Sequence, residues 1–334
     1  MRIRLLTCLM LILCTLLCAC QPQRLDTAAN AEGSENEQVD AVVSPHSNIR
    51  IGVSMQGLQR PYIVRVRDQL ERIEREMDGE IDLIILDGQE NSEKQNAQVE
   101  HFISKKVDVI IFNAISYEEG SLGVELANEA GIPIVLLITT VENTEKTQAQ
   151  AISDHKESAL IQIDMVGEYL GGKGNIVILE GLKGIESQLE RTEGYIEGLQ
   201  KYPDIKTVEI QTANWTRADA YAIVENWIRL GKEFDAVVAQ NDNMALGALK
   251  AVEEANMQDS IVVFGIDGDM DAMLLVKEGR LQGTVYHDAA GQAERAIEYA
   301  ITLVQGYDVE SEPVPFLRVD QANVDYYIGL EEGR

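Results

Sequence analysis

The chain has 334 residues, 45% of them hydrophobic and 25% charged, which is the composition of a globular protein long enough for about two domains. Asp and Glu number 56 against 28 Lys and Arg, so the formal net charge is −28. Such an acidic surface repels phosphate, which argues against nucleic-acid binding and against docking on anionic lipid through surface charge.

The N-terminus has the pattern of an export signal. A basic start with Arg2 and Arg4 precedes an apolar run over residues 5–17, which is too short to span a bilayer comfortably. The following Leu-Cys-Ala-Cys resembles the lipobox of bacterial lipoproteins, which makes Cys20 the lipidated first residue of the mature chain. We therefore predict a signal peptide over residues 1–19. The alternative is a simple cleaved signal with incidental cysteines.

Residues 20–47 follow as a polar stretch with few large apolar side chains, so we predict a flexible tether behind the lipid. All four cysteines lie at or before position 20, so the rest of the chain has no disulfide, no thiolate metal site and no cysteine nucleophile.

From residue 48 onward, short β-branched runs alternate with amphipathic stretches. Helical spacing of apolar residues begins at Tyr62 in the first half and at Tyr221 in the second, where it places Trp227 in the core. The expected strands are 49–53, 81–86, 107–112 and 134–138, and then 175–179, 207–211, 235–239 and 261–265. Two successive sets of this kind predict an α/β fold of two doubly wound, parallel-sheet lobes.

Ligands of doubly wound lobes bind beyond the carboxyl ends of the strands. The residues expected there are short amides, carboxylates and aromatics, with few basic groups. Such side chains suit hydroxyl donors and acceptors and the C–H face of a ring, so they favour a neutral polyol over a phosphate or carboxylate.

Several stretches resemble the type I periplasmic binding proteins of the ribose, galactose and glucose-binding branch. They are VAQNDNMALGA at 238–248, VFGIDG at 263–268, SDHKES at 153–158 and GTVYHD at 283–288. The resemblance covers about residues 48–308. It implies an N-terminal lobe of residues 48–153 with 288–316, and a C-terminal lobe of residues 154–287 with 317–334. The lobes would close on the ligand about a hinge of several strands.

The resemblance also implies the ligand contacts. Trp215 and Tyr62 would cover opposite faces of a sugar ring, and Asn241, Asp267 and His287, taken as the only histidine near the cleft, would bind hydroxyls. Asn113, Asp154 and Arg191 also match polar positions of the family. Many relatives have polar residues after the fourth strand that bind the sugar, whereas this chain has Ile-Thr-Thr at 138–140. The resemblance therefore does not determine which sugar is bound.

Other interpretations of these residues stay open. Trp215 could be a partly buried cap, Asp267 could cap the helix that begins near Asp269, and Asn241 could be a turn residue. Arg191 and His287 could be structural. A calcium loop beginning at Asp267 is disfavoured because its sixth position is Ala272 rather than glycine.

We therefore expect a monomeric, lipid-anchored, extracytoplasmic binding protein with no cofactor, no metal and no enzymatic activity. Its ligand would be a monosaccharide or similar polyol, and its partner an ABC importer permease. The alternative partner is a membrane histidine kinase or chemoreceptor, to which the same fold would report ligand occupancy.

Overall fold

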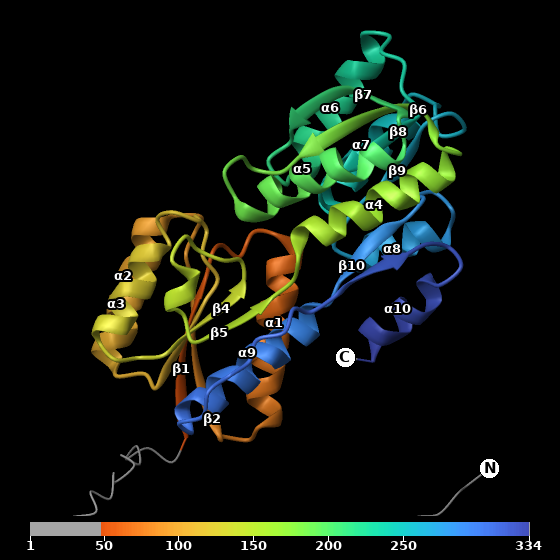
Figure 1. Ribbon diagram of the computed structural model, residues 1–334. Helices are drawn as coiled ribbons and strands as arrows, with labels where there is room; N and C mark the ends of the chain where they lie inside the picture. Colours follow the sequence, from red (N-terminus) through yellow and green to blue (C-terminus); the bar gives the residue numbers. More distant parts are fainter. Residues whose placement is uncertain (1–47, 334) are drawn as a thin grey trace, which may run out of the picture. The chain divides into compact units, whose positions relative to one another are not determined.

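Two parallel sheets organise the computed structural model, which describes residues 48–333 (Figure 1). The predicted signal peptide, the lipidation site at Cys20 and the tether lie outside these residues. Within the described part, no helix is both long and apolar enough to cross a membrane.

The first sheet has the strand order β2-β1-β3-β4-β5, and every neighbouring pair is parallel. Its third and fourth strands are buried along their whole length, as expected of a sheet covered on both faces. The strands are β1 (Ile49–Met55), β2 (Ile81–Asp87), β3 (Val109–Phe112), β4 (Ile134–Ile138) and β5 (Ala149–Ile152).

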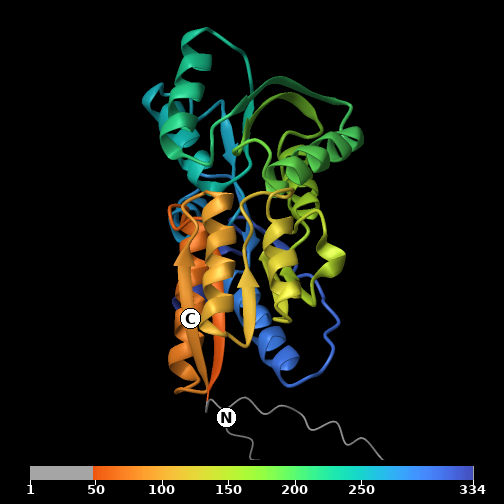
Figure 2. The same ribbon diagram turned by 90° about the vertical axis from the view of Figure 1, so that its left-hand side faces the viewer.

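Helices cover both faces of this sheet. Helices α1 (Pro61–Glu76) and α9 (Ala289–Val304) pack together on one face, and the predicted stripe of α1 is buried there. Helices α2 (Ser92–Lys105) and α3 (Ser121–Glu129) cover the other face, where Figure 2 shows them side by side. A short 3-10 turn (Thr144–Lys146) follows β4. Pro61 begins α1 because proline is pre-set for the first helical position.

The second sheet has the order β7-β6-β8-β9, again wholly parallel. Its strands are β6 (Lys173–Glu180), β7 (Asp204–Thr212), β8 (Ala236–Ala239) and β9 (Val262–Phe264). Helices α4 (His155–Tyr169) and α5 (Glu186–Gly198) cover one face, and a 3-10 turn (Leu199–Lys201) follows α5.

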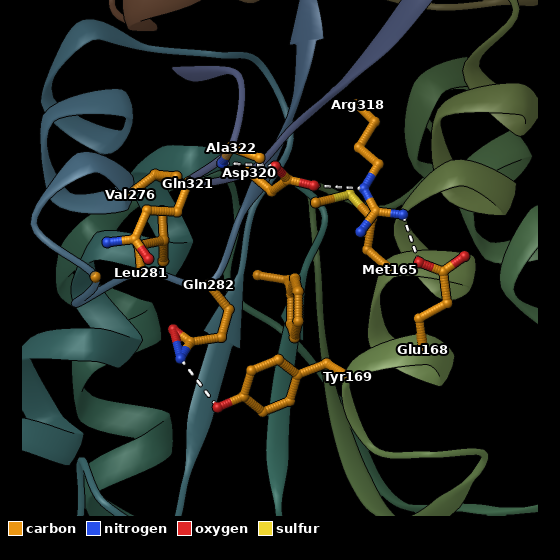
Figure 3. A pocket seen from close by; sticks show the side chains of 12 residues that line it. Met165, Glu168, Tyr169, Val276, Leu281, Gln282, Arg318, Asp320, Gln321 and Ala322 are labelled. Carbon is orange, nitrogen blue, oxygen red and sulfur yellow. Dashed lines mark hydrogen bonds and ion pairs between the residues drawn. The ribbon is translucent and has the colours of Figure 1, made fainter. Parts of the chain in front are cut away.

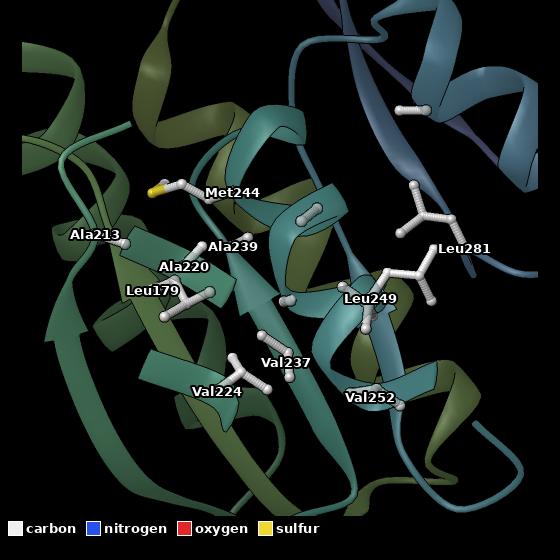
Figure 4. Packing of buried hydrophobic residues seen from close by; sticks show 14 of the residues in the cluster. Leu179, Ala213, Ala220, Val224, Val237, Ala239, Met244, Leu249, Val252 and Leu281 are labelled. Carbon is white, nitrogen blue, oxygen red and sulfur yellow. The ribbon is translucent and has the colours of Figure 1, made fainter. Parts of the chain in front are cut away.

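The other face of the second sheet carries the largest apolar core, part of which is drawn in Figure 4. This core includes Trp227, only 2% exposed, which confirms its predicted placement. The helices that build it are α6 (Arg217–Arg229), α7 (Asp242–Glu254), α8 (Met270–Lys277) and α10 (Val324–Glu332).

Two antiparallel strands, β10 (Thr284–His287) and β11 (Phe316–Val319), complete the fold. The chain passes between the layers of the two sheets after β5, after β10 and again before β11. The two sheets therefore define two lobes, and the predicted doubly wound α/β fold is confirmed.

Candidate functional site

A cavity lined by residues from both lobes lies at the carboxyl ends of the strands. Its volume is about 40 Å³, well below the roughly 300–1,000 Å³ of typical ligand pockets. Six of the eight predicted ligand residues line it, with Asn113 and Asp154 absent. The lining residues are Arg60, Pro61, Tyr62, Ile63, Ile138, His155, Ser187, Arg191, Trp215, Asn241, Asp267 and His287.

Tyr62 and His287 form an aromatic stack at one side of the cavity. Their ring centroids are 3.9 Å apart and the planes are 5° from parallel. The Tyr62 hydroxyl donates to Gln292 Oε1 (2.9 Å), and the Arg65 guanidinium lies 5.4 Å from the Tyr62 ring centroid. These neighbours leave little of the Tyr62 ring on which a ligand could stack.

Trp215 lies in the loop after β7, with a left-handed backbone (φ 62°). Its ring packs against Gly181 so closely that a Cβ at that glycine would lie 2.0 Å from the ring. The interpretation of Trp215 as a helix cap is wrong, because the Thr216 side chain accepts from Asp219 N and caps α6. Trp215 is buried, with 5% of its surface exposed, and yet its indole Nε1 has no hydrogen-bond partner.

Arg191 and Asp267 face one another in the buried part of the site. Nη2 of Arg191 lies 3.7 Å from Oδ1 of Asp267, and Nη1 donates to the carbonyl of Gln240. Burial raises the pKa of the Asp267 carboxyl, and the nearby guanidinium opposes that shift. Asp267 does not cap the following helix, because α8 begins at Met270 with Asp269 in the N-cap position.

Asn241 is the N-cap residue of α7, a role that was not predicted for it, and it also lines the cavity. Its side-chain oxygen accepts from Met244 N (2.9 Å) and caps α7, while the residue also lines the cavity. An asparagine suits this position because it satisfies one of the helix's free N–H groups and still has an amide group to offer.

His155 is a second histidine in the site, so the prediction that His287 is the only one near the cleft is wrong. Its ring lies edge-on to His287 with centroids 5.7 Å apart, and Nε2 is 3.2 Å from the carbonyl of Ile138. Burial, with a contribution from Arg191, lowers the pKa of His155 to about 3. The imidazole is therefore neutral at pH 7, and Nε2 donates to that carbonyl and leaves Nδ1 as an acceptor. The sequence carried one signal for His155, because it lies in the SDHKES stretch that resembles the binding-protein family.

Five buried nitrogens of cavity-lining residues have no hydrogen-bond partner. They are Nε of Arg191, Nε1 of Trp215, Nδ1 of His155 and both ring nitrogens of His287. Burial also lowers the pKa of His287 well below its usual range, so this ring offers one donor and one acceptor. Because buried polar groups are normally paired, such a concentration of unpaired ones marks a place prepared for a polar ligand.

The structure does not bring Asn113 and Asp154 into this cavity. The amide of Asn113 is fully used: Oδ1 accepts from Gln56 N, and Nδ2 donates to Leu137 O and Thr139 Oγ1. Asn113 thus ties together the ends of β1, β3 and β4. Asp154 is exposed, and its carboxylate accepts from Glu157 N and caps α4.

A larger cavity of about 470 Å³ lies in the second lobe beside α4 and β11 (Figure 3). Its charged groups are already satisfied, because Arg318 pairs with both Glu168 and Asp320. Gln282 donates to the Tyr169 hydroxyl (3.2 Å). Unlike the smaller cavity, it has no unpaired buried polar atom among its lining residues within the described chain. A third cavity of about 390 Å³ is also lined by both lobes and includes Asp154, but among its described lining residues it too has no unpaired buried polar atom. We therefore take the 40 Å³ cavity as the candidate site.

Acidic residues near the site do not assemble a metal centre in the described part of the chain, where no three His, Cys, Asp or Glu side chains are placed to hold an ion. The segment considered as a calcium loop is largely helical, since α8 spans Met270–Lys277.

Comparison with known proteins agrees with this architecture. The chain is 33% identical over 286 residues to a putative rhizopine-binding protein of Rhizobium meliloti, covering 84% of this chain and 92% of the relative. It is 37% identical over 238 residues to a xylitol-binding protein of Mycolicibacterium smegmatis, covering 70% and 67% of the two chains.

Among solved structures, it is similar to an ABC transporter solute-binding protein from Bacillus halodurans with bound myo-inositol. The TM-score is 0.82 at 35% identity, and the match covers 86% of this chain and 99% of that one. Residues 51–308 match the periplasmic binding protein domain. The resemblance seen in the sequence is thereby confirmed, and the chain belongs to the type I periplasmic binding protein family.

Proposed function

We propose that this protein is an extracytoplasmic solute-binding protein that captures a neutral, polyhydroxylated ligand and delivers it to an ABC importer. The observation that carries the proposal is the set of five unpaired, buried nitrogens in one cavity. Their donors and acceptors, together with the Asp267 carboxylate, complement hydroxyl groups, which both donate and accept.

The chemistry of the cavity favours a neutral ligand. Both histidines are held neutral by burial, and the guanidinium of Arg191 is already engaged, lying 3.7 Å from the Asp267 carboxyl group and donating to the carbonyl of Gln240. The other lining arginine, Arg60, pairs with Glu90, so an anionic ligand would meet no unengaged guanidinium in the cavity. The relatives that bind xylitol and myo-inositol support a monosaccharide or cyclic polyol as the ligand class.

Lobe closure is the proposed mechanism of capture. The cavity takes Tyr62 from the first lobe and Trp215, Asn241 and Asp267 from the second. A ligand that contacts both lobes stabilises the closed arrangement by its differential affinity for the closed form. Since the cavity is only about 40 Å³, the lobes must part before a sugar-sized molecule can enter.

The lipid anchor at Cys20, the extracytoplasmic location and the monomeric state belong to the same proposal. A lipid-bound binding protein would stay beside its permease after release of the ligand. A sensor partner would use the same site, and stimulation of a permease ATPase by the liganded protein distinguishes the two roles.

A ligand screen tests the proposal. Thermal shift of the mature chain would be measured against myo-inositol, xylitol, ribose and galactose, with nucleosides and amino acids as the other classes. A ligand at 100 times its dissociation constant adds about 2.7 kcal/mol to the stability of the folded state, a readily measured shift. A shift with a sugar or polyol is the expected result. A shift confined to nucleosides or amino acids, or none at all, would contradict the proposal.

A further inference from the structure

Arg65, on α1 of the first lobe, contacts a short loop of the second lobe beside the candidate site. Its Nη2 donates to the carbonyl of Asp267 (2.8 Å), and its Nη1 donates to the carbonyl of Gly268 (3.2 Å). The same guanidinium lies 3.3 Å from Oδ1 of Asp269 and 3.6 Å from Oε2 of Glu331 on α10. One side chain of the first lobe therefore has four partners in the second.

These contacts are largely shielded from solvent. The Arg65 side chain is 19% exposed, and those of Asp269 and Glu331 are 11% and 12% exposed. Screening by water and salt is weak at such exposures, so these pairs differ from ordinary surface ion pairs. A planar guanidinium that donates to two successive carbonyls also fixes the loop geometrically, which a lysine ammonium would not do.

The loop that Arg65 holds has an unusual backbone. Asp267 has φ 128° and Gly268 has φ 67°, and the first of these is costly for a residue with a side chain. A Cβ at Gly268 would lie 2.6 Å from the Tyr286 ring, so the loop is pressed against β10. The carbonyl of Asp267 accepts from both Arg65 Nη2 and His287 N (3.1 Å). Such a conformation persists only where its surroundings fix it, and Arg65 is one of the groups that do so.

We infer that Arg65 is a positioning residue for ligand binding: from the opposite lobe it fixes the loop that carries Asp267, so lobe closure and the placement of this carboxylate occur together. The inference rests on the proposed function, since it assigns Arg65 a part in forming the same site. Arg65 itself does not line the cavity.

Loss of the Arg65 contacts should affect the closed form of the protein and not the open form. All four of its partners in the second lobe separate from it when the lobes part, so the contacts stabilise the closed form over the open one. Removing the guanidinium should therefore weaken binding and shift the protein toward the open form, while each lobe keeps its own core. A residue that only supported the fold would instead lower the stability of the unliganded protein and leave affinity unchanged.

The test compares Arg65→Met with Arg67→Met on the same helix. Arg67 is a matched control because its ion pairs, with Asp68 and Glu71, stay within α1. Calorimetry with the ligand found in the screen should show a dissociation constant roughly 10–100-fold higher for Arg65→Met, the range for losing charge-assisted hydrogen bonds. The control should change it by less than about twofold, as expected for an exposed pair, and Arg65→Lys should give an intermediate loss because it keeps only the charge.

A second measurement follows closure directly and needs no ligand. The chain from residue 20 with Cys20→Ser has no native cysteine, so spin labels at Glu118→Cys and Lys183→Cys, one exposed site in each lobe, report the distance between the lobes. Arg65→Met should shift the distance distribution to longer values with and without ligand, and Arg67→Met should not.

Wild-type affinity and an unshifted distance distribution in Arg65→Met would overturn the inference while leaving the proposed function intact. A loss of unliganded thermal stability with unchanged affinity would overturn it too, by making Arg65 a fold-stabilising residue. Failure of the wild-type chain to bind any sugar or polyol would count against the proposed function, and the unliganded distance measurement would still decide the role of Arg65.

Discussion

Substitution of Gly181 by alanine should impair ligand binding through the Trp215 ring. Gly181 follows β6, and its φ lies outside the left-handed region, so alanine fits the backbone. Its Cβ, however, would lie 2.0–2.2 Å from three atoms of the indole ring. Because ordinary carbon contacts are about 3.5–4.0 Å, the ring must move by roughly 1.5 Å. It is expected to move away from Gly181 and into a cavity of only about 40 Å³.

Two opposing effects determine how Gly181→Ala changes the free energy of unfolding. Overpacking of a buried site costs about 1–3 kcal/mol, and alanine recovers about 0.4–1 kcal/mol by restricting the unfolded chain. Their difference spans about 0–2.6 kcal/mol, so we expect a net destabilisation near the middle of that range, about 1–2 kcal/mol. That corresponds to a fall in melting temperature of roughly 2–8 °C for a chain of this size.

The assay measures stability and binding in the same preparations. Denaturant unfolding and calorimetric titration would be run on Gly181→Ala and on the control Gly329→Ala, an exposed helical glycine with no atom within 4 Å of its added Cβ. Gly181→Ala should lose at least about tenfold in affinity, as expected when one polar contact is misplaced, while Gly329→Ala should bind as the wild type does. Tryptophan fluorescence assigns the change, since Trp215 and Trp227 are the two tryptophans of the chain. Unchanged affinity and stability in Gly181→Ala would refute the idea that the indole is held at the edge of the ligand site.

Three further predictions concern Asn241 and His155 of the site and Glu190, which lines the neighbouring cavity of about 390 Å³. Asn241→Ser keeps a side-chain oxygen that can cap α7 but removes the amide, so stability should fall by no more than about 1 kcal/mol. Affinity should fall about tenfold. Denaturant unfolding and calorimetry measure the two effects, and a loss of stability without a loss of affinity would make Asn241 a cap alone. The pKa of His155 is about 3 in the folded protein and near 6.5 in the unfolded chain. The neutral ring therefore contributes to folding stability above pH 6.5, and this contribution is lost as the pH falls. The stability of wild type relative to His155→Gln should thus decline below pH 6.5, by at most about 1.4 kcal/mol per pH unit. If the difference in stability did not depend on pH, the ring would not be buried in its neutral form. Burial, with Glu186 as a charged neighbour, raises the pKa of Glu190 to about 7, so the ionised carboxylate disfavours the folded state above pH 7. Glu190→Gln should therefore be more stable than wild type at pH 8 and lose this advantage below about pH 4.5, and a gain that persists in acid would refute the assignment.

The layered α/β architecture could be predicted from the amino-acid pattern alone. The runs at β3, β4 and β8 are apolar on both faces, which only a sheet covered on both sides can satisfy. The apolar stripe of α1 likewise has to face a core. The rule that ligands lie beyond the strand ends also placed Trp215, Asn241 and Asp267 at the cavity. These features can be predicted because local periodicity is visible in the sequence and the rule on strand ends applies to doubly wound sheets in general.

The hydrogen-bond partners of each side chain, in contrast, depend on how the lobes fold. Asn113 follows β3 as a ligand residue would, yet its amide is used by three strands that meet there, and Asp154 caps α4 at the surface. His155 enters the site because α4 starts where the chain crosses between the lobes, and Arg65 reaches Asp267 from a distance of 202 residues along the chain. Hydrogen-bond partners, burial and the resulting pKa shifts depend on which distant groups surround a side chain. That information exists only after the lobes have folded, because long-range neighbours are not encoded in local spacing.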